Sequence, residues 1–154
     1  MGRYRDRAQF GKRQEFIAIS ELLQRGFDVY IPLVDDQQVD CIIKKVRDGK
    51  PIYIDIQIKA RSRDCKPYDA ARFSAMTVNP RDNYFFIFYS EQLNTYWIIP
   101  SKELVKIASQ NKKGKNKGKY SINLALYSKN KGPSPNPKFN KYQDDEGFKL
   151  LEEF

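Results

Sequence analysis

The chain of 154 residues contains no histidine and only two cysteines. Without histidine it cannot build a Ser-His-Asp or Cys-His catalytic centre, nor a zinc site that uses imidazole. The spacing of Cys41 and Cys65 fits neither a metal-binding nor a redox pair, and two thiols cannot form an all-cysteine zinc site. Any general acid or base must be Lys, Asp, Glu, Tyr or a metal-bound water. The many oxygen ligands favour Mg²⁺, with Mn²⁺ as a substitute.

Long apolar segments are also missing, since no run approaches the length of a membrane span. The first ten residues, MGRYRDRAQF, contain no apolar signal region. Asp6 stands where a myristoylation site requires Ser or Thr. We therefore expect no membrane partner and a cytoplasmic location with reduced thiols.

Acidic residues are outnumbered, with 19 Asp and Glu against 28 Lys and Arg and a net charge of +9. Such an excess favours a polyanionic partner, and nucleic acid is the default. A basic structural protein, for instance one that binds RNA, fits the charge as well. The length and the ten Tyr, ten Phe and one Trp suit one domain, 1–154, with its own core.

The most informative segment is a predicted hairpin around an Asp48-Gly49 turn. Asp-Gly between two apolar runs is the strongest short-range signal of a two-residue hairpin loop. With that loop, Arg47 pairs with Lys50, and Asp40 lies directly across from Gln57. Opposite side chains of an antiparallel pair share one face, with Cβ atoms about 5 Å apart.

The second strand of this hairpin alternates strictly between apolar and polar residues. One parity holds Ile52, Ile54, Ile56 and Ile58, and the other holds Tyr53, Asp55, Gln57 and Lys59. The isoleucines predict a core-facing side. Asp40, Gln57 and Lys59 then share the opposite face, which predicts a metal site beside a positive group. The alternative is the wet face of a half-exposed strand.

The other elements follow from periodicity and turn residues. We predict a loose basic arm over 1–8, helix 8–25, strand 28–34 with either an edge position or a bend because of Pro32, and a polar connector over 35–38. Later come an irregular stretch 60–83 with a short helix at 69–76, a buried strand 84–89 and strand 96–99. The rest is helix 102–109 capped by Ser101, a basic loop 111–119, strand 120–127, loop 128–137, and a closing helix capped by Asp144 or Asp145. The long crossover before 84–89 allows parallel pairing, which predicts an α/β fold with a mixed sheet flanked by helices.

A helix carrying Glu15, then Val39-Asp40, then Gln57-Ile58-Lys59 at the end of a strand, resembles the PD-(D/E)xK nuclease superfamily, which has the restriction-endonuclease-like fold. The resemblance covers roughly the first 100 residues. It implies a Mg²⁺-dependent endonuclease that hydrolyses DNA, of repair, restriction, junction-resolving or homing type, acting as a dimer.

The resemblance also implies a role for each motif residue. Asp40 would bind the metal, the backbone carbonyl of Ile58 would add a ligand, and Glu15 would contribute from the helix. Lys59 would position or activate the attacking water. Gln57 would take the place of a metal-binding carboxylate. Val39 replaces the proline of the motif, a minor change, whereas a neutral Gln57 supplies no charge to a cation.

Gln57 leaves a second function open, a nucleic-acid-binding module of the same fold that has lost catalysis. Glu15 is equally read as a helix-surface carboxylate, and Asp55 as a substitute ligand or a bystander. The residues expected to contact nucleic acid, DNA in preference to RNA, are basic: Lys12, Arg13, Arg61, Arg63, Lys112, Lys113, Lys115 and Lys117. The lysine loop fits a solvated, mobile loop as well as a DNA contact.

Overall fold

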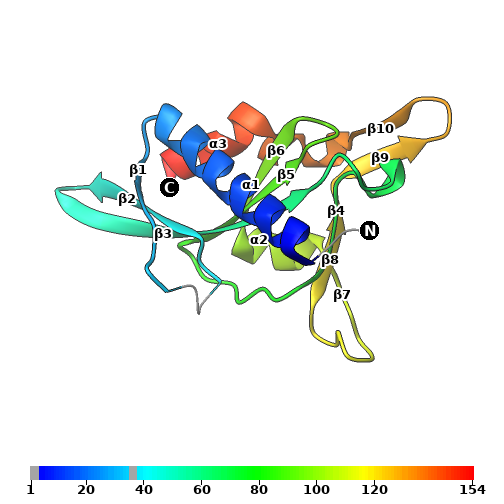
Figure 1. Cartoon of the computed structure of the whole chain (residues 1–154). Helices are drawn as coiled ribbons and strands as arrows, with labels where there is room; N and C mark the ends of the chain where they lie inside the picture. Colours follow the sequence, from blue (N-terminus) through cyan, green and yellow to red (C-terminus); the bar gives the residue numbers. More distant parts are fainter. Residues whose placement is uncertain (1–3, 35–37) are drawn as a thin grey trace.

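A five-stranded mixed sheet organises the chain in the computed structural model, which describes residues 4–34 and 38–154 (Figure 1). Its strand order is β1 (Asp28–Tyr30), β2 (Cys41–Arg47), β3 (Lys50–Arg61), β5 (Tyr84–Ser90) and β6 (Thr95–Pro100). β3 and β5 run parallel, and the other neighbours are antiparallel. The predicted fold class is confirmed. The edge position, one of the two alternatives for the first strand, is confirmed too, although β1 ends at Tyr30 and not at residue 34.

The centre of the sheet is apolar on both faces. In β5, five consecutive residues from Tyr84 to Phe88 are buried, as expected for a strand covered on both sides. On one face the isoleucines of β3 pack with Leu22 of α1 (Tyr4–Gln24) and Leu151 of α3 (Asp144–Glu153). The helix predicted over 8–25 begins earlier, at Tyr4. Residues that were expected to form a loose arm therefore lie in its first turns.

The opposite face is covered by α2 (Ser101–Ile107) and a small second sheet. That sheet contains β4 (Arg72–Met76), β8 (Tyr120–Asn123) and β7 (Ser109–Gln110). The short helix expected at 69–76 is wrong. A 3-10 turn, η1 (Pro67–Asp69), is followed by β4, whose Phe73 and Met76 are buried against the main sheet.

Two further predictions in the C-terminal third are wrong. The strand expected over 120–127 is interrupted at Leu124, so β8 and β9 (Ala125–Ser128) belong to different sheets. Leu124 is fully buried, and its N–H donates to the carbonyl of Ala71 at 2.9 Å. The expected loop 128–137 contains β10 (Gly132–Pro135), paired with β9, and leads into η2 (Pro137–Tyr142).

Neither predicted helix cap forms. Ser101 is the first residue of α2, and its hydroxyl exchanges hydrogen bonds with the backbone of Arg81. Asp144 accepts a hydrogen bond from the N–H of Tyr96 at 2.9 Å, which ties α3 to β6. Both side chains serve tertiary contacts that a local pattern cannot reveal. Within the described residues, no helix is long and apolar enough to cross a membrane.

Gly147 is required where α3 packs on η2. A Cβ built there would lie 2.0 Å from the carbonyl oxygen of Tyr142 and 3.0 Å from Ile98 Cδ1. Because a backbone oxygen cannot move aside as a side chain can, Gly147→Ala should lower the free energy of unfolding by about 2 kcal/mol. Urea denaturation checks this, with Gly11→Ala on α1, where a Cβ would meet nothing within 4 Å, as the matched control. Unchanged stability of Gly147→Ala would show that α3 can shift.

Candidate active site

The predicted hairpin register is confirmed. Every β2–β3 partner follows the two-residue loop, from Arg47 opposite Lys50 to Cys41 opposite Ile56. The regular ladder ends there, and the N–H of Asp40 donates to the carbonyl of Ile56 at 2.7 Å, outside the regular pairing. Asp40 and Gln57 are each only 8% exposed. Asp40 contacts the backbone of Ile56 and of Ile58, the two neighbours of Gln57, whereas a direct pairing of the Asp40 and Gln57 side chains stays a prediction.

The Asp40 carboxylate terminates the β2–β3 ladder. Its Oδ2 accepts a hydrogen bond from the backbone N–H of Ile58 at 2.6 Å. If the ladder continued, a backbone carbonyl of β2 would accept this bond. In an antiparallel ladder the N–H and C=O of one residue point toward the same neighbouring strand. The carbonyl of Ile58 therefore points toward the edge that Asp40 occupies. Asp40 and this carbonyl are the two oxygen ligands that the superfamily resemblance implied on this hairpin.

Gln57 has an unsatisfied acceptor. Its Oε1 is buried and has no hydrogen-bond partner among the described residues. An unpaired buried amide oxygen costs free energy of about 1 to 3 kcal/mol, so such atoms usually indicate a missing partner. A cation is one partner that an acceptor-only atom can take. Gln57 could therefore contribute one neutral oxygen ligand to a cation.

Glu15 reaches the same region from α1. Burial first, and then the negative charges of Asp40 and Glu15, raise the pKa of the Cys41 thiol to about 12. Both carboxylates thus lie within electrostatic reach of one thiol at the start of β2. Glu15 is 24% exposed, and its Oε2 accepts from Lys12 Nζ at 3.1 Å. Cys41 itself stays protonated and inert.

Lys59 and Asp55 share the face of Gln57, but their surroundings differ. Lys59 is half-buried near the end of β3, beside Phe88 of β5. Asp55 forms a 2.6 Å ion pair with Arg81, whose guanidinium lies 4.1 Å from the centre of the Tyr84 ring. This pairing neutralises the Asp55 carboxylate and favours the interpretation of Asp55 as a bystander.

The donor set is unusual for a metal site. Over residues 4–34 and 38–154, no three side chains of His, Cys, Asp or Glu cluster closely enough to hold an ion. A cation at this site would therefore depend on the Asp40 and Glu15 carboxylates together with the Gln57 amide oxygen and the Ile58 carbonyl. Two charged ligands and two neutral oxygens form a weaker donor set than three carboxylates.

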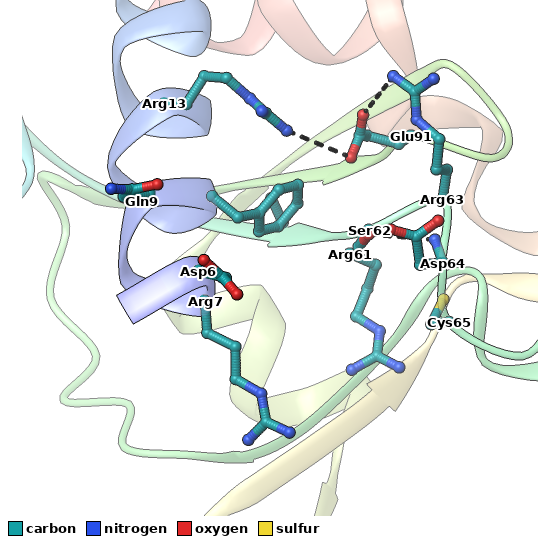
Figure 2. A pocket seen from close by; sticks show the side chains of 12 residues that line it. Asp6, Arg7, Gln9, Arg13, Arg61, Ser62, Arg63, Asp64, Cys65 and Glu91 are labelled. Carbon is teal, nitrogen blue, oxygen red and sulfur yellow. Dashed lines mark hydrogen bonds and ion pairs between the residues drawn. The ribbon is translucent and has the colours of Figure 1, made fainter. Parts of the chain in front are cut away.

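A cavity of about 980 Å³ lies at the C-terminal end of β3, next to this site (Figure 2). We call it the arginine cavity, because Arg7, Arg13, Arg61 and Arg63 line it. The other lining residues are Asp6, Gln9, Phe10, Ala60, Ser62, Asp64, Cys65 and Glu91. It lies between the first half of α1 and the segment that follows Lys59.

Glu91 holds two walls of the arginine cavity together. Its side chain is only 9% exposed, and its two oxygens lie 4.0 Å from Arg13 Nη2 and 3.1 Å from Arg63 Nη2. Its N–H donates to the carbonyl of Arg61 at 3.0 Å. Sequence reasoning missed Glu91. The predicted parallel pairing was the available signal, because it aligns the ends of β3 and β5, with Arg61 opposite Ser90 and Glu91 next in the chain.

The remaining basic residues occupy different places. Arg61 lines the arginine cavity, and its Nε donates to the carbonyl of Asp69 at 3.2 Å. Lys112, Lys113, Lys115 and Lys117 are exposed on the tip between β7 and β8, which projects away from the sheet in Figure 1. That tip is organised by turns, including a 3.1 Å bond from the N–H of Lys117 to the carbonyl of Gly114. The expected loop is therefore a turn-structured hairpin tip.

The chain matches no known family model and no curated protein. Among solved structures it is similar to a bacterial homing endonuclease, I-Ssp6803I, with a TM-score of 0.59 and 19% identity. The similarity covers 93% of this chain and 90% of that chain. It therefore extends to the C-terminal third, beyond the first 100 residues that carry the sequence resemblance. The two proteins share a fold, a mixed sheet flanked by helices.

Proposed function

We propose that this protein is a Mg²⁺-dependent endonuclease of the PD-(D/E)xK type that hydrolyses phosphodiester bonds in DNA. The observation that carries the proposal is the hydrogen bond from the N–H of Ile58 to the Asp40 carboxylate, which places Asp40 beside the strand segment that holds Lys59 and the orphaned oxygen of Gln57. The fold shared with a homing endonuclease and the charge of +9 support it. A homodimer, a cytoplasmic location and the kind of DNA process stay predictions.

The proposed metal ligands and Lys59 differ in charge, and their roles differ accordingly. Asp40 and Glu15 would hold the ion, with neutral help from Gln57 and the Ile58 carbonyl. Mg²⁺ or Mn²⁺ at such a site supplies Lewis-acid chemistry toward a phosphodiester. Lys59 places a positive charge beside the phosphate, where negative charge builds up as the bond breaks, and it orients the attacking water. No histidine is needed for this chemistry.

A cleavage screen tests the proposal. Linear, nicked, single-stranded and four-way DNA are incubated with the protein in Mg²⁺, in Mn²⁺ and in EDTA. We expect nicking or cutting with either cation and none in EDTA. The neutral Gln57 favours the second candidate, a binding module without catalysis, which predicts salt-sensitive binding that Mg²⁺ does not change. Absence of cleavage on every substrate would decide for that module.

The tip between β7 and β8, which we call the lysine tip because Lys112, Lys113, Lys115 and Lys117 are exposed on it, should contribute nonspecific affinity for DNA. Lys115→Gln with Lys117→Gln removes two exposed positive charges, and each lost phosphate contact reduces the slope of log K against log salt by about 0.9. We expect the slope to fall by about 2 for any DNA sequence, measured by fluorescence anisotropy. Lys129→Gln with Lys131→Gln, on the exposed β9–β10 turn, is the matched control. Equal slopes for the two double variants would place the lysine tip outside the DNA contact.

A further inference from the structure

We propose that the arginine cavity binds unpaired nucleotides of the DNA strand, so that the substrate has a single-stranded stretch next to the cleavage point. The inference rests on the proposed function, and it adds the shape of the substrate. Three features of the cavity lead to it: its position along β3, the surfaces that line it, and the arrangement of its charges.

The cavity continues directly from the candidate active site. Ala60 and Arg61 follow Lys59 on the same strand, and both line the cavity. Two residues of strand span about 7 Å, so the Arg61 backbone lies one short step from that of Lys59. A DNA strand with one phosphate beside Lys59 would therefore continue into the cavity.

The volume and the walls suit a nucleotide better than a phosphate alone. A space of about 980 Å³ is at the upper end of the range for small-molecule sites, and a lone phosphate would leave most of it empty. The half-buried Phe10 lines the cavity, and the Arg13 guanidinium lies 5.4 Å from the centre of its ring. Unpaired bases stack on aromatic rings and on guanidinium planes, whereas bases inside a duplex have their faces covered by their neighbours.

The charges are arranged for an anion. Glu91 fixes Arg13 and Arg63, which share this single carboxylate. Arg7 and Arg61 have no carboxylate partner among the described residues, and in Figure 2 their guanidinium ends point away from Glu91. The other two lining carboxylates, Asp6 and Asp64, belong to exposed residues. Two arginines that share Glu91 and two without a carboxylate partner among the described residues thus line a space that also offers a stacking ring.

Binding measured in EDTA tests the inference without cleavage. Fluorescence anisotropy compares a blunt DNA duplex with the same duplex carrying a single-stranded tail that contains 2-aminopurine. We expect the tailed DNA to bind about tenfold tighter, and the 2-aminopurine to be quenched by stacking. Phe10→Ala should abolish both the preference and the quenching while affinity for the blunt duplex stays. Phe16→Ala, an exposed phenylalanine on the same helix, should change neither.

The outcomes separate this inference from the proposed function. Equal affinity for both DNAs, or loss of tail binding in Phe16→Ala as in Phe10→Ala, would overturn the cavity assignment. Cleavage of blunt duplex in Mg²⁺ as fast as tailed duplex would also overturn it and leave the nuclease proposal standing. Tail preference without cleavage in Mg²⁺ or Mn²⁺ would support the cavity as a DNA site and reject the nuclease.

Discussion

Asp40→Asn is expected to slow Mg²⁺-dependent DNA cleavage by about 10³-fold and to leave the fold intact. Asparagine keeps an oxygen that can accept the hydrogen bond from Ile58 N–H, so the variant removes the charge and not the contact. Asp40→Ala is less informative, because it would leave that buried N–H unpaired at a cost of about 1 to 3 kcal/mol. Single-turnover cleavage and thermal unfolding are measured on the same preparations.

Asp48→Asn is the matched control. Asp48 is an exposed residue of the hairpin turn with φ 52°, a conformation that asparagine also tolerates. It loses the same charge at the far end of the same hairpin, so it should cleave like the parent. If Asp40→Asn also cleaves like the parent, Asp40 serves only to terminate the β2–β3 ladder and the catalytic site lies elsewhere.

Lys59→Met extends this test to the positive side of the site. Methionine keeps most of the length of the side chain and its packing near the end of β3, so loss of cleavage by about 10²-fold would report the missing charge. Lys50→Met, at the exposed start of the same strand, is its control. A normal rate in Lys59→Met would remove Lys59 from the proposed chemistry.

The hairpin register beside the candidate site was predictable because local chemistry determines it. The Asp48-Gly49 turn fixes the loop length, and the loop length fixes the register as far as Cys41 opposite Ile56. The buried β5 strand and its parallel partner followed from a continuous apolar run after a long crossover. In both cases a short stretch of sequence carries the whole signal.

The second and third sheets were not predictable in the same way. Phe73 and Met76 are three residues apart, a spacing that fits a helix face, yet they lie in β4, which pairs with β8 nearly fifty residues later. Ala75, with φ 55°, lies where the register of that pairing shifts. Long-range pairing of short strands leaves no local period in the sequence. For the same reason the hydroxyl of Ser101 bonds to Arg81 where a helix cap was expected.

Gln57→Glu should make the stability of the protein strongly dependent on metal. Without metal, a carboxylate at a position that is 8% exposed and flanked by the two residues that Asp40 contacts should lower the free energy of unfolding by about 2 kcal/mol near neutral pH. Burial and the Asp40 charge raise the pKa of the new carboxyl above its unfolded value of about 4.3. The folded state then binds more protons than the unfolded state, so stability should fall as the pH rises through this interval.

Mg²⁺ should reverse this loss, because a third carboxylate adds the charge that the donor set lacks. We expect Mg²⁺ to bind at least about tenfold tighter to Gln57→Glu than to the parent, and Tm to rise accordingly. Thermal unfolding in EDTA and in Mg²⁺, from about pH 5 to about pH 8, measures both effects. Gln24→Glu adds the same charge at an exposed position of α1 and should show neither.

The parent protein in the same experiment separates the two candidate functions. A Mg²⁺-dependent rise in Tm of the parent, lost in Asp40→Asn, is what a working site with a neutral ligand predicts. If Mg²⁺ leaves the Tm of the parent unchanged but raises the Tm of Gln57→Glu, the protein is a binding module whose metal site was lost at this one residue. If neither responds, the orphaned oxygen of Gln57 does not face a cation, and the placement of Asp40 beside the strand segment that holds Gln57 and Lys59 reflects strand geometry alone.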